Sequence, residues 1–132
     1  MQRDHKRTGK SASGLTLTME NYLETVYRLN ADVVRINNIA AHLHIPFAES
    51  AAIAKELRDK GFVGFEKYGF ITLTESGRQM GEFLTRRHET VVRLLRTVNG
   101  DAFFPEEADD IKHFLSRDTV GNIEKYLNTN IL

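Results

Sequence analysis

The sequence predicts a mainly α-helical fold: a winged helix-turn-helix of three helices and a two-stranded wing, followed by an α-helical region. Apolar residues recur at three- and four-residue spacing over most of the chain, as they do in amphipathic helices. Pro46 separates a short helical segment from a longer one, since the residue before proline avoids helical geometry. After the longer segment the helical spacing of apolar residues ends, and a β-rich pattern typical of a hairpin follows. A winged helix-turn-helix has this order of elements: a short helix, a turn, a longer helix and a hairpin.

The first helix is expected to begin near Thr18 and to end near residues 30–32. A short extended piece at residues 33–35 follows, and Asn37 is placed to cap a second, short helix. After Pro46 a third helix is expected over residues 47–59, where Gly61 ends it. The apolar stripe of the first helix consists of Met19, Tyr22, Leu23, Val26, Tyr27 and Leu29.

Residues 62–66 and 70–73 are rich in β-formers and flank a short turn at residues 67–69, which predicts the hairpin. Thr74 is placed to cap a long helix that begins at Glu75 and continues to about Val98. Pro105 suits the first turn of another helix, and Ser116 caps a last one. The apolar residues of these later helices exceed what two short helices readily cover, which favours a dimer.

Composition narrows the function classes. The 132 residues include 18 basic and 18 acidic side chains, so bulk charge alone does not favour a polyanion partner. Cysteine is absent, which excludes thiol catalysis, disulfides and thiolate metal sites. Neither a secretory signal nor an apolar run of about 20 residues is present, so we expect a cytoplasmic protein with no membrane partner. The familiar nucleophile and nucleotide-binding motifs are also missing, and we do not expect an enzyme or a small-molecule substrate.

Several short motifs share one register from about residue 17 to residue 127. They are Met19-Glu20-Asn21-Tyr22-Leu23-Glu24, residues 38–43, Glu66-Lys67-Tyr68, Leu73-Thr74-x-x-Gly77, Arg87-His88-Glu89 and Asp109-x-x-x-His113-Phe114-Leu115-Ser116. Together these motifs resemble those of the DtxR/MntR family of metal-responsive repressors. The resemblance implies a homodimer of winged helices that binds a double-stranded DNA operator and represses metal-ion uptake genes. It also implies a Mn²⁺ or Fe²⁺ ion, and the short architecture of manganese-type members.

The chain accordingly divides into three expected parts. Residues 1–14 are polar, contain four basic side chains against one acidic, and are interpreted as a disordered basic arm. Residues 15–75 are the winged helix-turn-helix DNA-binding domain. Residues 76–132 form the helical dimerisation and metal-binding region.

Four side chains are the expected metal ligands: Glu24, His88, Asp109 and His113. Asp109, Lys112 and His113 are spaced by three and four residues and are expected to share one face of the helix that begins at Pro105. Two carboxylates and two imidazoles would suit several divalent ions. Asn21 can act as a further ligand through its amide oxygen, although the resemblance implies a carboxylate there. Lys112 occupies a position where the resemblance implies a metal-binding glutamate, and an ammonium group offers only donors.

Two interpretations of Lys112 follow. In one, the side chain turns to solvent, and a single weakened metal site persists. In the other, the ammonium takes the place of the metal and pairs with Glu24 or Asp109. No metal would then bind, and the protein would be a regulator that has lost metal gating.

The third helix, which would enter the major groove, is poor in hydrogen-bond donors. Its alanines can contact only apolar groups such as thymine methyls, and Glu49 would repel phosphates. This depletion leaves open an alternative function, a winged-helix protein-interaction module. The expected DNA-contacting residues are Asn37, Asn38, Glu49, Ser50, Ala51, Lys55, Arg58 and Lys67.

Overall fold

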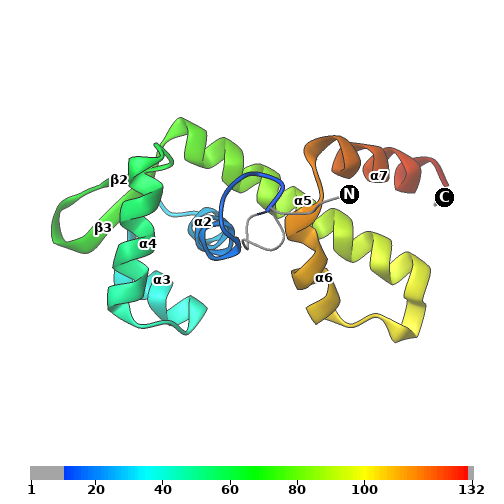
Figure 1. Ribbon diagram of the computed structural model, residues 1–132, viewed down its shortest axis with the longest axis horizontal. Helices are drawn as coiled ribbons and strands as arrows, with labels where there is room; N and C mark the ends of the chain where they lie inside the picture. The colour runs from blue at the N-terminus through cyan, green and yellow to red at the C-terminus, as the bar shows by residue number, and fades with distance from the viewer. Residues whose placement is uncertain (1–10, 131–132) are drawn as a thin grey trace, which may run out of the picture. The chain divides into compact units, whose positions relative to one another are not determined.

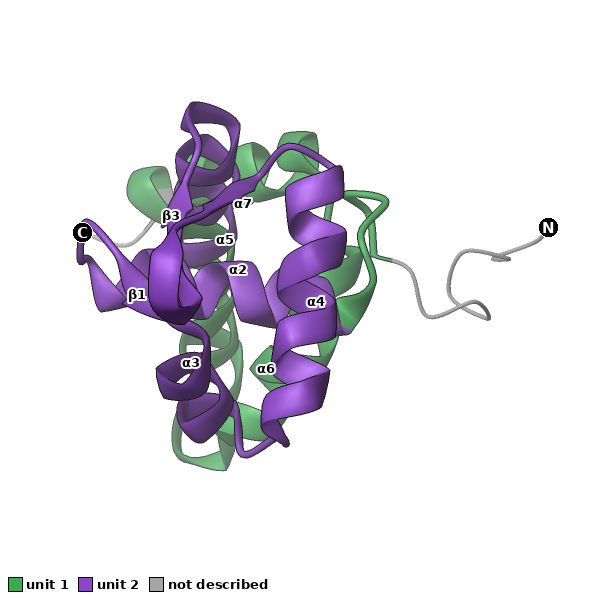
Figure 2. Ribbon diagram, turned by 90° about the vertical axis from the view of Figure 1, so that its left-hand side faces the viewer, with its two compact units in different colours: residues 1–17, 86–132 green, residues 18–85 purple. Residues whose placement is uncertain are grey.

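The computed structural model describes residues 11–130, and it confirms the mainly helical winged-helix class. The chain forms two compact units (Figure 2). One unit comprises residues 18–85; the other comprises residues 86–132 with the segment up to residue 17. Most of the expected basic arm, residues 1–10, lies outside the described residues.

The winged unit is built on three helices, α2 (Leu17–Leu29), α3 (Ile36–Leu43) and α4 (Phe47–Asp59) (Figure 1). A left-handed residue, His44 with φ 57°, ends α3, and Pro46 is the N-cap of α4. The short connection between α3 and α4 is therefore set by these two residues. The core of the unit contains four buried residues of the α2 stripe, together with the buried residues Ile39, Ile53, Ala54 and Leu57. Tyr27 and Leu29, also in the stripe, are half-buried.

The sheet has three strands rather than the two expected. β1 (Val34–Arg35), β2 (Val63–Phe65) and β3 (Phe70–Leu73) pair antiparallel in the order β1-β3-β2. The extended piece before α3 thus becomes an edge strand, because Val34 pairs with Ile71 and both side chains are buried. A short 3₁₀ turn, η1 (Lys67–Gly69), forms the tip of the wing.

The start of α5 (Glu75–Asn99) is fixed by Thr74 and Gly77. The Thr74 hydroxyl accepts from the Gly77 N–H at 3.0 Å and donates to the Gly61 carbonyl at 2.6 Å, so the predicted cap is confirmed. A Cβ at Gly77 would overlap the carbonyl of Phe62. The Leu73-Thr74-x-x-Gly77 motif therefore joins the wing to the long helix through a cap and a close backbone approach.

The second unit contains the later part of α5, then α6 (Pro105–Ile111) and α7 (Arg117–Asn130), with short 3₁₀ turns η2 (Gly100–Ala102) and η3 (Lys112–Phe114). Pro105 lies in the first turn of α6, as predicted. Ser116 caps α7, since its hydroxyl accepts from the Thr119 N–H at 3.2 Å. The apolar cluster of this unit is formed by Val91, Leu95 and Ala108, with Val92, Phe103, Ile111 and Leu115 packed against it.

Two expectations about this unit need correction. The helix that begins at Pro105 stops at Ile111 and tightens into η3, so Asp109 lies in a different element from Lys112 and His113. The second correction concerns the last four residues of the expected disordered arm, residues 11–14, which have a defined structure. Residues 11–14 form a turn in which Ser11 is buried, and the Ser11 N–H donates to the Leu15 carbonyl at 2.9 Å. No helix among the described residues is long and apolar enough to cross a membrane.

Candidate functional site

The solvent-facing side of α3 and α4 carries most of the side chains expected to contact DNA. Asn37 and Asn38 are exposed in the first turn of α3. On α4, Glu49, Lys55 and Arg58 are exposed, and Ala51 is half-buried. These side chains lie on the two helices of the helix-turn-helix, of which the second is the one that enters the major groove in this motif.

Ser50 is the exception, because it lies in the core with none of its surface exposed. Its hydroxyl is 2.8 Å from the Tyr22 hydroxyl and donates to the Ile36 carbonyl at 3.0 Å. The Ser50 side chain therefore cannot reach DNA, and the expectation that it contacts DNA is wrong. Burial raises the pKa of Tyr22 above its ordinary value of 10.0, and the bond with Ser50 acts in the opposite direction.

The wing is held against α4 by a cation–π contact. The Arg58 guanidinium lies 4.5 Å from the centre of the Phe65 ring in β2, and it also contacts Asp59 at 3.4 Å. At the opposite edge of the sheet, the Arg35 guanidinium lies 4.9 Å from the Phe70 ring. The Arg58 side chain is thus oriented by the wing as well as by its own helix.

Two exposed aromatic residues on this surface were not among the expected contacts. Tyr68, at the tip of the wing beside the exposed Lys67, has 81% of its surface exposed and a left-handed backbone with φ 64°. Phe47, the first residue of α4, is 58% exposed. For Tyr68 a signal was available in the sequence, because an aromatic residue in a hairpin turn cannot pack into the core.

The helical unit places a lysine among the expected metal ligands. The Lys112 Nζ lies 3.4 Å from His88 Nδ1, and the same nitrogen of His88 is 3.8 Å from Asp109 Oδ1. Lys112 is 6% exposed and His113 is 4% exposed. The interpretation in which Lys112 turns to solvent is therefore wrong. The ammonium contacts an imidazole, whereas the sequence suggested a carboxylate partner.

Backbone contacts hold η3 in this position. The His113 carbonyl accepts from the Ala12 N–H at 2.9 Å and from Arg87 Nη1 at 3.4 Å. Arg87 is itself buried, with 1% of its surface exposed. Two different parts of the chain therefore hold the backbone of η3, which carries the buried Lys112.

Glu24, the fourth expected ligand, lies in the winged unit. Its Oε2 accepts from Arg28 Nε at 2.9 Å, one helical turn along α2. Glu24 is buried, whereas Asn21, on the same helix, is exposed. The carboxylate is thus already neutralised in part by a side chain of its own helix.

These side chains do not fit a divalent cation well. Within residues 11–130 no group of three or more histidine, cysteine, aspartate or glutamate side chains is arranged to hold a metal ion. Lys112 supplies donors where an ion needs lone pairs. Two unit charges 4 Å apart repel by about 4 kcal/mol at an effective dielectric constant of about 20, and a divalent ion would double that cost.

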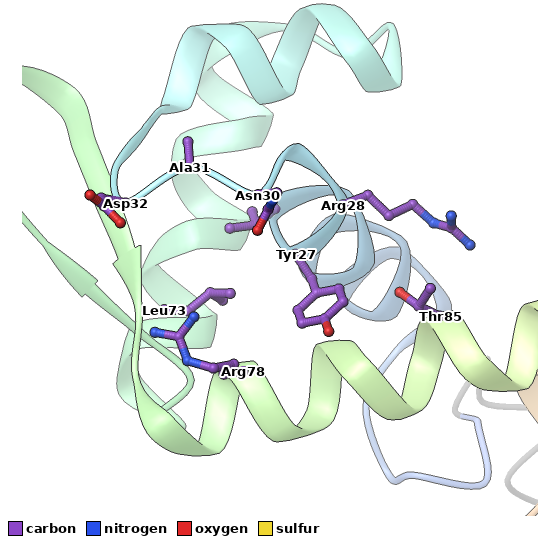
Figure 3. A pocket seen from close by; sticks show the side chains of 9 residues that line it. Tyr27, Arg28, Asn30, Ala31, Asp32, Leu73, Arg78 and Thr85 are labelled. Carbon is purple, nitrogen blue, oxygen red and sulfur yellow. The ribbon is translucent and has the colours of Figure 1, made fainter.

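A separate pocket of about 590 Å³ lies in the winged unit, between the end of α2 and the start of α5 (Figure 3). Figure 3 shows the Tyr27 ring directed toward α5, and Arg78 beside Leu73. The Tyr27 side chain is so close to Gly81 that a Cβ there would lie 2.6 Å from the Tyr27 Cβ. The charged side chains that line the pocket are Arg28, Asp32 and Arg78.

Comparison with known proteins agrees with this architecture. A family model described as the iron dependent repressor, metal binding and dimerisation domain matches residues 74–130. An HTH-type transcriptional regulator MntR from Lysinibacillus sphaericus is 30% identical over 111 residues, which cover 82% of this chain and 80% of that protein. A regulator of the same name from Oceanobacillus iheyensis is 28% identical over 116 residues, covering 86% of this chain and 79% of the relative.

Solved structures show the same fold at lower identity. IdeR of T. acidophilum superposes with a TM-score of 0.69 at 19% identity, and the manganese regulator SloR with a TM-score of 0.68 at 23% identity. Each alignment covers 83% of this chain but 53% of the solved chain, so this chain spans about half the length of those two proteins. A hypothetical protein from Sulfolobus solfataricus gives a TM-score of 0.69 at 22% identity and is covered over 91% of its length.

Proposed function

Since this chain belongs to the DtxR/MntR family of metal-dependent transcriptional repressors, we propose that it binds a double-stranded DNA operator as a homodimer and represses transcription. The observation that carries the proposal is the winged helix-turn-helix of residues 18–85, in which α4 presents an exposed face and the wing follows directly. Metal-ion uptake genes are the proposed targets, and binding to chromosomal DNA would place the protein in the cytoplasm.

The mechanism of DNA binding follows from the side chains on α4 and the wing. The α4 helix would enter the major groove, with the half-buried Ala51 near base edges. Lys55 and Arg58 would contact phosphates and fix the register. The contact of Arg58 with Phe65 joins the wing to α4, and Lys67 at the tip of the wing would contact the neighbouring backbone while α4 is in the groove.

Few of these groups read bases directly. Ser50 is committed to the core, and Glu49 can only accept, from an amino group of cytosine or adenine. We therefore propose that recognition depends on DNA shape and on phosphate contacts to a large degree. Specificity would then come from how readily the operator adopts the geometry that the two winged units of a dimer require.

Dimerisation is assigned to the region of residues 74–130, which matches the metal binding and dimerisation domain. This part of the chain exposes three large apolar side chains, Val98, Phe104 and Tyr126. Aromatic side chains such as Phe104 and Tyr126 are enriched at interfaces between subunits. Family membership does not favour the alternative of a protein-interaction module, and we propose no enzymatic activity.

The proposal is tested by selecting bound duplexes from a random DNA pool with the purified protein and measuring their affinity. A selected duplex should bind roughly 1,000-fold or more tightly than a scrambled duplex of equal length. Recovery of no enriched sequence, together with equal affinity for both duplexes, would show that the chain is not a sequence-specific regulator.

A further inference from the structure

We infer that Lys112 is a tethered cation that takes the place of the divalent ion in this protein, so that its DNA binding does not require metal. The inference deepens the proposed function, on which its consequence for DNA rests. It starts from a disagreement between the family, whose members depend on metal, and the side chains of this chain.

The first argument is the position of the ammonium group. Lys112 Nζ lies 3.4 Å from His88 Nδ1, and that nitrogen also faces Asp109 Oδ1 at 3.8 Å. His88 and Asp109 are two of the four ligands that the family resemblance implies. The positive charge therefore lies beside an imidazole nitrogen that also faces a carboxylate, at a position where the family resemblance implies a metal ligand.

The second argument concerns the lone pair of His88. A neutral imidazole has one nitrogen that can accept, and the Lys112 ammonium has only donors. When Nδ1 accepts from Lys112, its lone pair is not available to a metal ion. Lys112 thus competes with a metal for the same electron pair, besides repelling its charge.

The third argument is the burial of Lys112. The side chain is buried, and η3 is held by the contacts of the His113 carbonyl with Ala12 and Arg87. A long charged side chain is rarely buried unless it is paired. Burial next to His88 therefore indicates a structural role for the positive charge.

An independent observation comes from the winged unit. There the predicted ligand Glu24 accepts from Arg28 at 2.9 Å. Expected ligands in both units are thus engaged by cationic side chains of the chain itself. A protein whose ligands are matched in this way can hold its folded arrangement without a metal ion.

The test is a titration of the chelator-treated full chain with Mn²⁺, in which free ion is followed by its electron paramagnetic resonance signal. We expect no stoichiometric uptake by the wild type. The Lys112→Glu variant, which replaces the ammonium with a carboxylate ligand, should take up Mn²⁺ stoichiometrically. The control is Lys125→Glu, which makes the same charge change at an exposed position of α7 and should behave as the wild type.

The outcomes are distinct. Stoichiometric uptake by the wild type, or no gain in Lys112→Glu, would overturn the inference whether or not the protein binds DNA. Absence of sequence-specific DNA binding would instead overturn the proposed function. If Lys112→Glu does not fold, Lys112→Met replaces it: its affinity for the selected duplex in chelator should fall, and unchanged affinity in a folded variant would contradict the role of the ammonium.

Discussion

Tyr22 and Ser50 form a buried hydrogen bond of 2.8 Å that joins α2 to α4, and the Ser50 hydroxyl extends it to α3 through the Ile36 carbonyl. Three helices of the winged unit therefore meet at one hydroxyl group. The orientation of α4 relative to α2 and α3 depends on a polar contact within an apolar core, which specifies geometry more sharply than packing alone.

Replacement of Ser50 by alanine tests this contact. Ser50→Ala leaves the buried Tyr22 hydroxyl without this partner, and the cost of such a group is about 1–3 kcal/mol. We expect the free energy of unfolding in urea to fall by that amount. Ser76→Ala, at an exposed position of α5, should change it by less than about 0.5 kcal/mol. Equal stabilities of the two variants would mean that the hydroxyl contact is not structural.

A second prediction concerns Gly77, at the junction of the wing and α5. A methyl group there would overlap the Phe62 carbonyl, so Gly77→Ala should destabilise the protein by about 1–3 kcal/mol or more. Gly121 lies in α7 with open space around it, and Gly121→Ala should stabilise by roughly 0.5–1 kcal/mol. Thermal unfolding of both variants checks the opposite signs. A stable Gly77→Ala protein would contradict the close approach.

The proposed phosphate contacts predict the salt dependence of DNA binding. Lys55→Ala and Lys67→Ala should each weaken binding to the selected duplex and reduce the slope of log affinity against log salt by about 1. Lys125→Ala, outside the winged unit, should leave that slope unchanged. Fluorescence anisotropy at several salt concentrations measures it. A slope that matches the wild type in both winged-unit variants would remove these residues from the interface.

The exposed apolar side chains of the helical unit predict where the dimer forms. Phe104→Glu should raise the dimer dissociation constant by about tenfold or more, which corresponds to 1.4 kcal/mol. Phe47→Glu, at a similarly exposed aromatic residue of the winged unit, should leave dimerisation unchanged. Sedimentation equilibrium distinguishes the two. If the wild type is a monomer at micromolar concentration, the dimeric architecture is wrong.

Much of the fold was predictable because each signal is local. The helix period, the cap at Thr74, Pro46 before α4 and Pro105 at the start of α6 all act within a few residues. The third strand was not predicted, because a segment of two residues, Val34 and Arg35, is too short to show a strand pattern. It becomes a strand only because Val34 pairs with Ile71 in the folded chain. Pairing at such a sequence distance is a property of the folded chain.

The candidate site was less predictable, because it depends on contacts between residues that are far apart in the sequence. Spacing placed Asp109, Lys112 and His113 on one helical face, but the chain tightens into η3 after Ile111 and turns Lys112 inward. Ser50 resembled a DNA contact because serine at the start of α4 is polar, yet its hydroxyl bonds within the core. Burial and tertiary hydrogen bonds decided both cases.

The most direct test of the whole account is the affinity of the purified protein for its selected duplex and for a scrambled duplex, measured in chelator and in Mn²⁺. The account predicts a large preference for the selected duplex, of the same size in both conditions. Equal affinity for the two duplexes would contradict a DNA-binding regulator, and a preference that appears only with Mn²⁺ would contradict the role assigned to Lys112.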